Sequence, residues 1–185
     1  YDPIDEPFGG YADDDAFTYD GIDPLYDGSM LTYDEIMEYL EVSPGTVQDG
    51  KCSEGLYAIG QGPKGAMSIA PGLYYLEGSQ AAVGEYLIFE PVAHPAEGDL
   101  YRLADSIVYM GNYFTDLKDG ELMAFMPAKG SETMAVATDE PLDAKEPYHS
   151  GCYRVGIDIP AGTYVVTLDA KAAEALDDTG ALPAG

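Results

Sequence analysis

An internal repeat constrains the fold of this chain more than any other feature. The pattern G-x-Y-x-[IV]-G occurs at residues 55–60 and again at 151–156. Each copy is followed by I-[AP]-[AP]-G-x-Y, at residues 69–74 and 159–164, with six extra residues between the blocks of the first copy. Recurrence of so many glycines and aromatic residues in one order indicates a structural module that is used more than once.

Around this repeat the chain divides into three parts. We expect a first β-module over residues 51–140, a partial second β-module over 141–185, and an acidic lead segment with one short helix over 1–50. From residue 51 onward apolar side chains tend to alternate with polar ones, which is typical of half-buried strands. The sequence therefore predicts an all-β fold, a β-sandwich or jelly-roll-like module with a partial second copy and one or two short helices.

The short helix has a defined start. Thr32 and Glu35 have the spacing of a capping box, in which each side chain accepts a hydrogen bond from the other residue's amide. Apolar residues then follow at helical spacing, which predicts a helix over about 33–41. An Ala-rich stretch from Asp169 to Asp178 predicts a second one.

Turn-forming residues predict two β-hairpins. Pro160-Ala161-Gly162 separates two alternating stretches, and we expect a positive φ angle at Gly162. Asp119-Gly120 separates two further apolar stretches, and Tyr86–Phe89 predicts a compact apolar strand. The residues expected to hold the turns and the strand register are Gly60, Gly72, Tyr74, Asp119, Gly120, Gly156, Pro160, Gly162 and Tyr164.

The second copy resembles a known family of small repeated β-modules. Residues 153–164 are similar to the "Y-x-V-G-x-D-I-P-A-G-x-Y" signature of modules in secreted and surface-attached proteins of Gram-positive bacteria. Residues 113–122 are similar to that family's later block, "Y-V-T-V-K-D-G-Q-Y-L". The first copy departs from the family in lacking a clean D-I-P-A-G core and in carrying an insertion at about 77–106. The resemblance implies an architecture and an extracellular or cell-surface location, and it implies no catalytic residues.

Charge narrows the choice of partners. The chain has 34 Asp and Glu against 8 Lys and Arg, a formal net charge of -26. Such a surface repels nucleic-acid phosphates and anionic lipid headgroups, so we expect no nucleic acid as partner. The sequence has no apolar run of about 18 residues, so we also expect no direct membrane insertion. A cation, a glycan or a basic protein are the partners that we consider, and solubility alone is the alternative explanation of the charge.

The lead segment holds the only candidate metal ligands, and we expect no other cofactor. Hard cations such as calcium prefer several carboxylate and carbonyl oxygens, although the spacing of an EF-hand is missing here. A solvated acidic run is the alternative interpretation. The candidate ligands are Asp13, Asp14, Asp15, Asp20 and Asp23.

No motif predicts an enzyme. Asp178-Thr179-Gly180-Ala181 matches the short aspartic-protease motif, but that chemistry needs a second such aspartate, which the sequence lacks. His94 and His149 are poorly placed for catalysis or for a metal. The sixteen tyrosines suit either ordinary strand packing or a sugar-binding surface, for which we favour the insertion at 77–106.

We therefore expect a non-enzymatic extracellular or cell-surface module with a spacer or adhesive role. The alternative is a module that binds a glycan or a cation, and a third possibility is a hydrolase whose residues lie in the insertion. Cys52 and Cys152 are the only cysteines, and both a disulfide and two free thiols remain open at this point.

Overall fold

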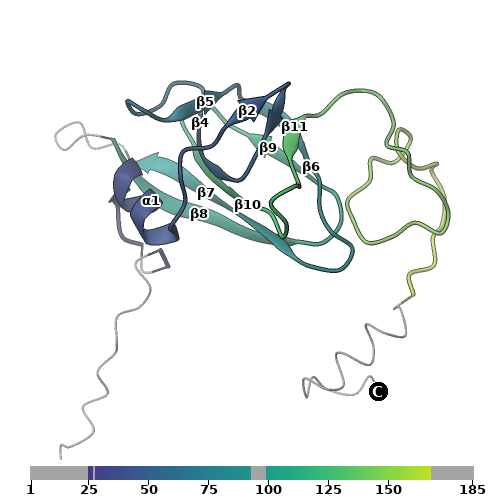
Figure 1. Ribbon diagram of the computed structural model, residues 1–185. Coiled ribbons are helices and arrows are strands. Elements are labelled where there is room, and N and C mark those ends of the chain that lie inside the picture. The colour runs from purple at the N-terminus through teal and green to yellow at the C-terminus, as the bar shows by residue number, and fades with distance from the viewer. Residues whose placement is uncertain (1–24, 27, 93–98, 168–185) are drawn as a thin grey trace, which may run out of the picture. The chain divides into compact units, whose positions relative to one another are not determined.

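The computed structural model describes residues 25–26, 28–92 and 99–167 (Figure 1). Every described strand and the described helix lie in the first of two compact units. The first unit comprises Tyr1–Thr138 and Pro147–Cys152, and the second comprises Asp139–Glu146 and Tyr153–Gly185.

The first unit is a sandwich-like arrangement of two β-sheets, so the prediction of an all-β fold is confirmed. The larger sheet has the order β1-β8-β7-β10-β4-β5, and the smaller has the order β2-β3-β11-β6-β9. The strands of the larger sheet are β1 (Leu31–Thr32), β8 (Leu100–Tyr109), β7 (Gly84–Val92), β10 (Leu122–Met126), β4 (Gly55–Ile59) and β5 (Met67–Ile69). Those of the smaller sheet are β2 (Val47–Gln48), β3 (Lys51–Cys52), β11 (Met134–Val136), β6 (Gly72–Leu76) and β9 (Tyr113–Leu117).

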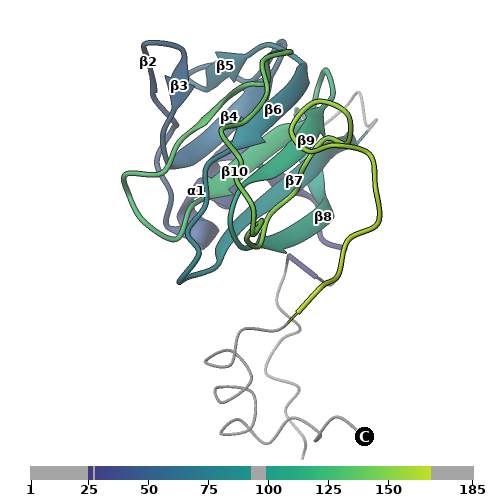
Figure 2. The same cartoon turned by 90° about the vertical axis from the view of Figure 1, so that its right-hand side faces the viewer.

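The main core lies between the two sheets. β4 and β10 are neighbours in the larger sheet and contribute Tyr57 and Phe125, both with no exposed surface. β6 and β11 of the smaller sheet contribute Leu76 and Met134, which are equally inaccessible. Figure 2 shows β4, β10, β7 and β8 running side by side in the larger sheet.

The outer face of the larger sheet is covered by helix α1 (Tyr33–Leu40). Ile36 of α1 is fully buried in the same apolar cluster as Leu56 of β4 and Leu122 of β10. The central strands are therefore buried on both faces, which explains why β10 reads Leu-Met-Ala-Phe-Met without polar alternation.

The helix begins as the sequence predicts. Thr32 N–H donates to the Glu35 carboxylate at 2.8 Å, and Glu35 N–H donates to the Thr32 hydroxyl at 3.3 Å. Both halves of the capping box are thus formed. The helix ends at Glu41, which adopts the left-handed conformation with φ 54°. The second predicted helix, 169–178, lies outside the described residues.

The prediction of a hairpin at Asp119-Gly120 is wrong, although the turn itself is formed. Gly120 has φ +89°, and Glu121 N–H donates to Lys118 O at 3.2 Å. β9 and β10, on either side of this turn, belong to different sheets. The turn therefore carries the chain across the sandwich, where Gly120 N–H donates to Ile59 O at 2.9 Å.

The predicted strand Tyr86–Phe89 is confirmed as part of β7. The insertion at 77–106 is largely a long antiparallel β7–β8 pair, which runs from Gly84↔Tyr109 to Val92↔Leu100. The insertion therefore widens the larger sheet.

Candidate functional site

The two copies of the repeat share their backbone geometry. Gly60 and Gly156 have φ angles of +75° and +87°. Gly60 N–H donates to Ile69 O, and Gly156 N–H donates to Ile159 O, both at 2.7 Å. In each copy the residue before this glycine pairs in parallel with that isoleucine. The repeat in the sequence therefore corresponds to a repeat of the local backbone geometry around these two glycines.

The predicted hairpin of the second copy is nevertheless wrong. The pairing between the blocks is parallel, and residues 160–167 belong to no strand. Gly162, where we expected a positive φ, does not adopt one, whereas its counterpart Gly72 does, at φ +141°. The tyrosine of the pattern makes the same hydrogen bond in both copies, to the carbonyl four residues earlier. The Tyr74 hydroxyl donates to Ala70 O, and the Tyr164 hydroxyl donates to Pro160 O.

Gly60 lies directly against the turn that crosses the sandwich. A Cβ atom at Gly60 would come within 1.7 Å of the Asp119 carboxylate, so these two predicted structural residues are in close contact. In the second copy, hydrogen bonds to a buried carboxylate hold the loop instead. The Asp158 carboxylate accepts Arg154 N–H at 2.7 Å, the Arg154 guanidinium at 2.9 Å and Leu142 N–H at 3.0 Å.

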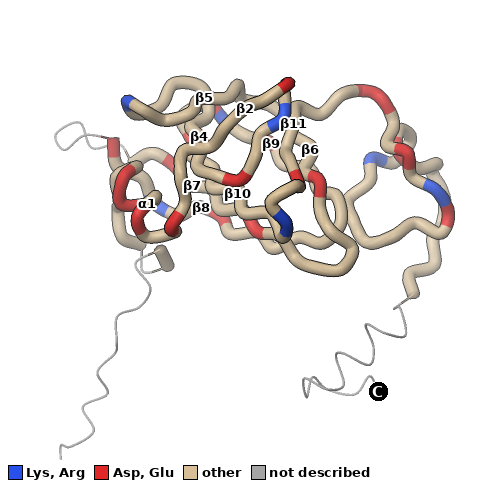
Figure 3. Tube along the Cα trace, in the orientation of Figure 1, with Lys and Arg blue, Asp and Glu red and all other residues tan. Residues whose placement is uncertain are grey.

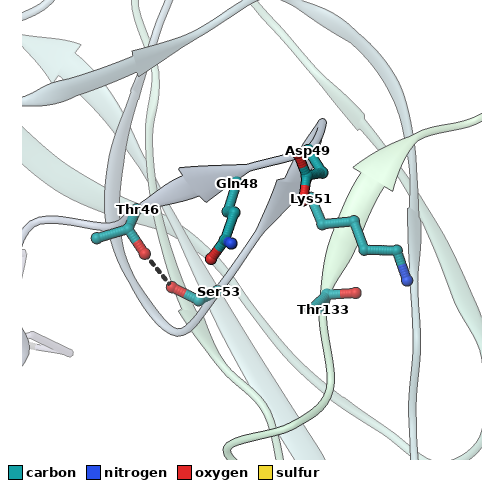
Figure 4. Close-up of a pocket in the computed structure, with 6 residues that line it drawn as sticks. All are labelled: Thr46, Gln48, Asp49, Lys51, Ser53 and Thr133. Carbon is teal, nitrogen blue, oxygen red and sulfur yellow. Dashed lines mark hydrogen bonds between the residues drawn. The ribbon is translucent and has the colours of Figure 1, made fainter.

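A polar pocket of about 260 Å³ opens beside the β2–β3 pair. It is lined by Thr46, Gln48, Asp49, Lys51, Ser53 and Thr133. The hydroxyls of Thr46 and Ser53 lie 2.7 Å apart and share a hydrogen bond (Figure 4). The pocket is therefore lined by residues with hydroxyl, amide and charged side chains, a set that suits a small polyhydroxylated molecule.

One side of the pocket is held by Glu77. Its carboxylate accepts the Thr133 hydroxyl at 2.7 Å and the Thr133 N–H at 3.2 Å, and the Lys51 ammonium lies 3.3 Å away. Burial acts to raise the pKa of Glu77, but the hydrogen bonds from Thr133 and Lys51 outweigh it and leave that pKa below its usual value. Glu77 is therefore ionised at neutral pH and forms a half-exposed ion pair with Lys51.

A local sequence signal for one wall of this pocket is the dipeptide Asp49-Gly50. Asp49 and Gly50 have φ angles of 52° and 78° and connect the paired residues Gln48 and Lys51. Positive φ at both central residues is the requirement of a type I′ hairpin turn, for which Asp-Gly is the favoured sequence. Thr133 was not predictable in this way, because it comes from a distant part of the chain.

Three tyrosines pack together in the core between the sheets. Tyr86, Tyr109 and Tyr113 form a triangle with ring centroids 6.0 to 6.2 Å apart. Tyr109 is only 3% exposed, and burial raises its pKa. These rings support strand packing, the first of the two interpretations of the tyrosine content.

The calcium prediction lies outside the described residues, since Asp13, Asp14, Asp15, Asp20 and Asp23 all precede residue 25, and it stays a prediction. Within the described residues no three His, Cys, Asp or Glu side chains gather as metal ligands would. Figure 3 shows acidic positions on α1, where Asp34 and Glu35 lie in the first turn. No helix in the described ranges has both the length and the apolar character to cross a membrane.

Both cysteines are free thiols in the structure. Cys52 is 2% exposed in the core between the sheets, and burial raises its pKa to about 11. Cys152 is half-buried, and its N–H donates to Asn112 O at 2.8 Å.

We expect two reactive thiols per chain when the unreduced protein is denatured, and one when it is native. Cys52 should be silent in the native protein at pH 8, because a buried thiol with a raised pKa forms little thiolate. Titration with a chromogenic disulfide reagent measures both numbers. Cys152→Ser should abolish the native signal, and a denatured protein without reactive thiols would contradict the assignment.

No family model matches the chain, and no match was found among curated proteins or among solved structures.

Proposed function

We propose that this chain is a non-enzymatic module of an extracellular or cell-surface protein and that its role is that of a spacer. The observation that carries the proposal is the second copy, which repeats the glycine conformation, the 2.7 Å hydrogen bond and the tyrosine contact of the first. Repetition of one β-unit along a chain is a common way to build length. The resemblance of residues 153–164 to surface modules of Gram-positive bacteria supports the location.

The charge and the core agree with this role. A spacer has to stay folded and must not associate with other copies of itself. A net charge of -26 makes such copies repel one another. A two-sheet core with α1 on its outer face gives the first unit a double layer of buried side chains. An adhesive role would add a basic protein or a glycan as partner.

The spacer role predicts resistance to mechanical load. In single-molecule pulling of the full chain between marker domains, we expect one discrete unfolding event for the first unit. It should release roughly 350 Å of contour length as residues 31–136 extend. Gradual extension without such an event would contradict a spacer, and retention of protein-coated beads on glycans or basic proteins would favour the adhesive role.

The polar pocket supports a second candidate, a glycan-binding module. Three residues with hydroxyl groups, Thr46, Ser53 and Thr133, line it together with Gln48 and Lys51. Saturation-transfer NMR with a panel of neutral and amino sugars tests this candidate. Thr133→Val should remove the signal, whereas Thr163→Val, the same change in the second unit, should leave it intact. Equal signals from both variants would exclude the pocket as the binding site.

A further inference from the structure

Each copy of the repeat begins with a similar contact to another part of the chain. Gly55 and Gly151, the first glycines of the two copies, have φ angles of +147° and +151°. At or next to each glycine lies a parallel bridge, Pro44↔Leu56 in the first copy and Asn112↔Gly151 in the second. The correspondence between the copies therefore extends to the way in which each one begins.

The two contacts differ in the groups that hold them. Leu56 N–H donates to Ser43 O at 2.9 Å, and Leu56 O accepts Gly45 N–H at 3.0 Å, so both hydrogen bonds join backbone atoms. Cys152 N–H likewise donates to Asn112 O at 2.8 Å. Cys152 O, however, accepts a hydrogen bond from the side-chain amide of Asn112. In the second copy a side chain therefore takes the place of the second backbone donor.

A second side-chain amide holds the same stretch of chain. The Gln80 amide donates to Ser150 O at 2.7 Å. Gly111 lies close to the same carbonyl, because a Cβ atom there would come within 1.9 Å of Ser150 O. Gly111 N–H in turn donates to Ser79 O at 2.8 Å, which joins the two sides of the contact. Residues 147–152, which we call the strap, are therefore held to the rest of the first unit by side-chain amides at two carbonyls.

Burial contributes less to the strap than to the start of the first copy. Leu56 has no exposed surface and lies within β4. None of residues 147–152, all of which the structure describes, is fully buried, and none belongs to a strand. Segments with few buried contacts and solvent-exposed backbone hydrogen bonds open at a low free energy while the rest of the protein stays folded.

We propose that the strap is a releasable attachment of the second copy to the first unit and that the side-chain amide of Asn112 keeps it closed. The strap contributes no strand to either sheet, so its opening leaves both sheets intact. Opening frees the six residues that lie between the two parts of the second unit, 139–146 and 153–185. The proposal rests on these contacts and applies equally to a spacer and to a glycan-binding module.

Hydrogen exchange of the full chain, measured in urea concentrations below the unfolding transition, tests whether the strap opens separately. The amide of Cys152 should exchange at a rate that urea hardly changes, because a local opening exposes little surface. The amide of Leu56 should exchange faster as urea increases, because only unfolding of the first unit exposes it.

Asn112→Asp tests which group keeps the strap closed. It replaces the donor with an acceptor of nearly the same shape, opposite the Cys152 carbonyl. The variant should accelerate exchange at Cys152 about tenfold or more and exchange at Leu56 less than about twofold. Asn112 is the only asparagine of the chain, so selective labelling of asparagine gives a single pair of side-chain amide signals. That pair should be protected from exchange in the original protein.

Gln80→Leu is the second variant, and Gln61→Leu is its matched control. Gln80→Leu removes the donor to Ser150 O and should accelerate exchange at Cys152 about fivefold. Gln61 is exposed and follows β4, so the same change there should leave exchange at Cys152 and at Leu56 within about twofold.

Three results would overturn the proposal. One is an equal urea dependence of exchange at Cys152 and Leu56, which would make the strap part of the cooperative fold of the first unit. Another is unchanged exchange at Cys152 in Asn112→Asp, which would show that the amide does not hold the strap. The third is equal acceleration at both positions in Asn112→Asp, which would assign Asn112 to the core. The pulling and saturation-transfer experiments test the proposed function separately from all three.

Discussion

Gly45→Ala is expected to lower the free energy of unfolding of the first unit by roughly 3 kcal/mol, and its Tm by about 10 °C. A Cβ atom at Gly45 would lie 2.0 Å from the ring of Tyr57. That ring cannot move aside, because Tyr57 is fully buried and its hydroxyl lies 2.6 Å from Ser53 O and 2.9 Å from Thr46 O. The backbones of Gly45 and Gly55 also lie close together, since a Cβ atom built on Gly55 would come within 2.5 Å of the Gly45 Cα.

Gly130→Ala is the matched control. No heavy atom lies within 4 Å of the position that a Cβ at Gly130 would occupy. The free energy of unfolding of this variant should therefore stay within about 0.5 kcal/mol of that of the unsubstituted protein. Urea unfolding followed by tyrosine fluorescence compares the two variants. Tyr57→Leu should rescue part of the loss when combined with Gly45→Ala, because the two residues are in contact. Equal midpoints for Gly45→Ala and Gly130→Ala would contradict the predicted overlap.

Asp158→Ala is expected to open the second unit locally. The Asp158 side chain has no exposed surface and joins the segment around Leu142 to the loop 154–158. Removing one partner of a buried ion pair costs about 3 kcal/mol or more. Hydrogen exchange at the amides of Leu142 and Arg154 should therefore accelerate about 100-fold or more. Asp143→Asn is the control in the same unit, because the Asp143 pair with Lys145 is 87% and 80% exposed.

The same carboxylate predicts a pH dependence. Hydrogen bonds from Arg154 lower the pKa of Asp158 from 3.8 to about 2, against the opposing effect of burial. Because the folded-state pKa is lower than the unfolded one, the stabilisation is complete above about pH 4 and disappears as the pH falls through 2. It amounts to roughly 2 kcal/mol. A carboxyl-carbon NMR titration of Asp158 with a midpoint near 3.8, or unaltered exchange at Leu142 in Asp158→Ala, would contradict the role of this ion pair.

Local sequence signals predicted the structure correctly where it depends only on residues nearby in the chain. The capping box of Thr32 and Glu35 contains all its partners within four residues, and it predicted the start of α1 correctly. The glycine pattern of the repeat matched the backbone in part: Gly60 and Gly156 share a positive φ angle, which is a property of single residues, whereas Gly72 has one and Gly162 does not.

Signals failed where distant strands decide the outcome. Asp119-Gly120 correctly predicted a turn, but turn chemistry does not determine whether the flanking strands pair with each other. Here β9 and β10 find partners in different sheets. The pocket was missed for the same reason, since Thr133 reaches it through the pairing of β11 with β3.

The pairing of β4 with β10 has a consequence for how the chain folds. Ala58 lies opposite Leu122, which comes 64 positions later, so the centre of the larger sheet forms only when two distant segments meet. Closing so long a loop costs conformational entropy before the packing contacts can form. Folding is therefore slow compared with a helical protein of this size. During synthesis the edge of β4 that pairs with β10 therefore stays unpaired until residue 126 is available. A chaperone that holds the nascent chain would act within this interval.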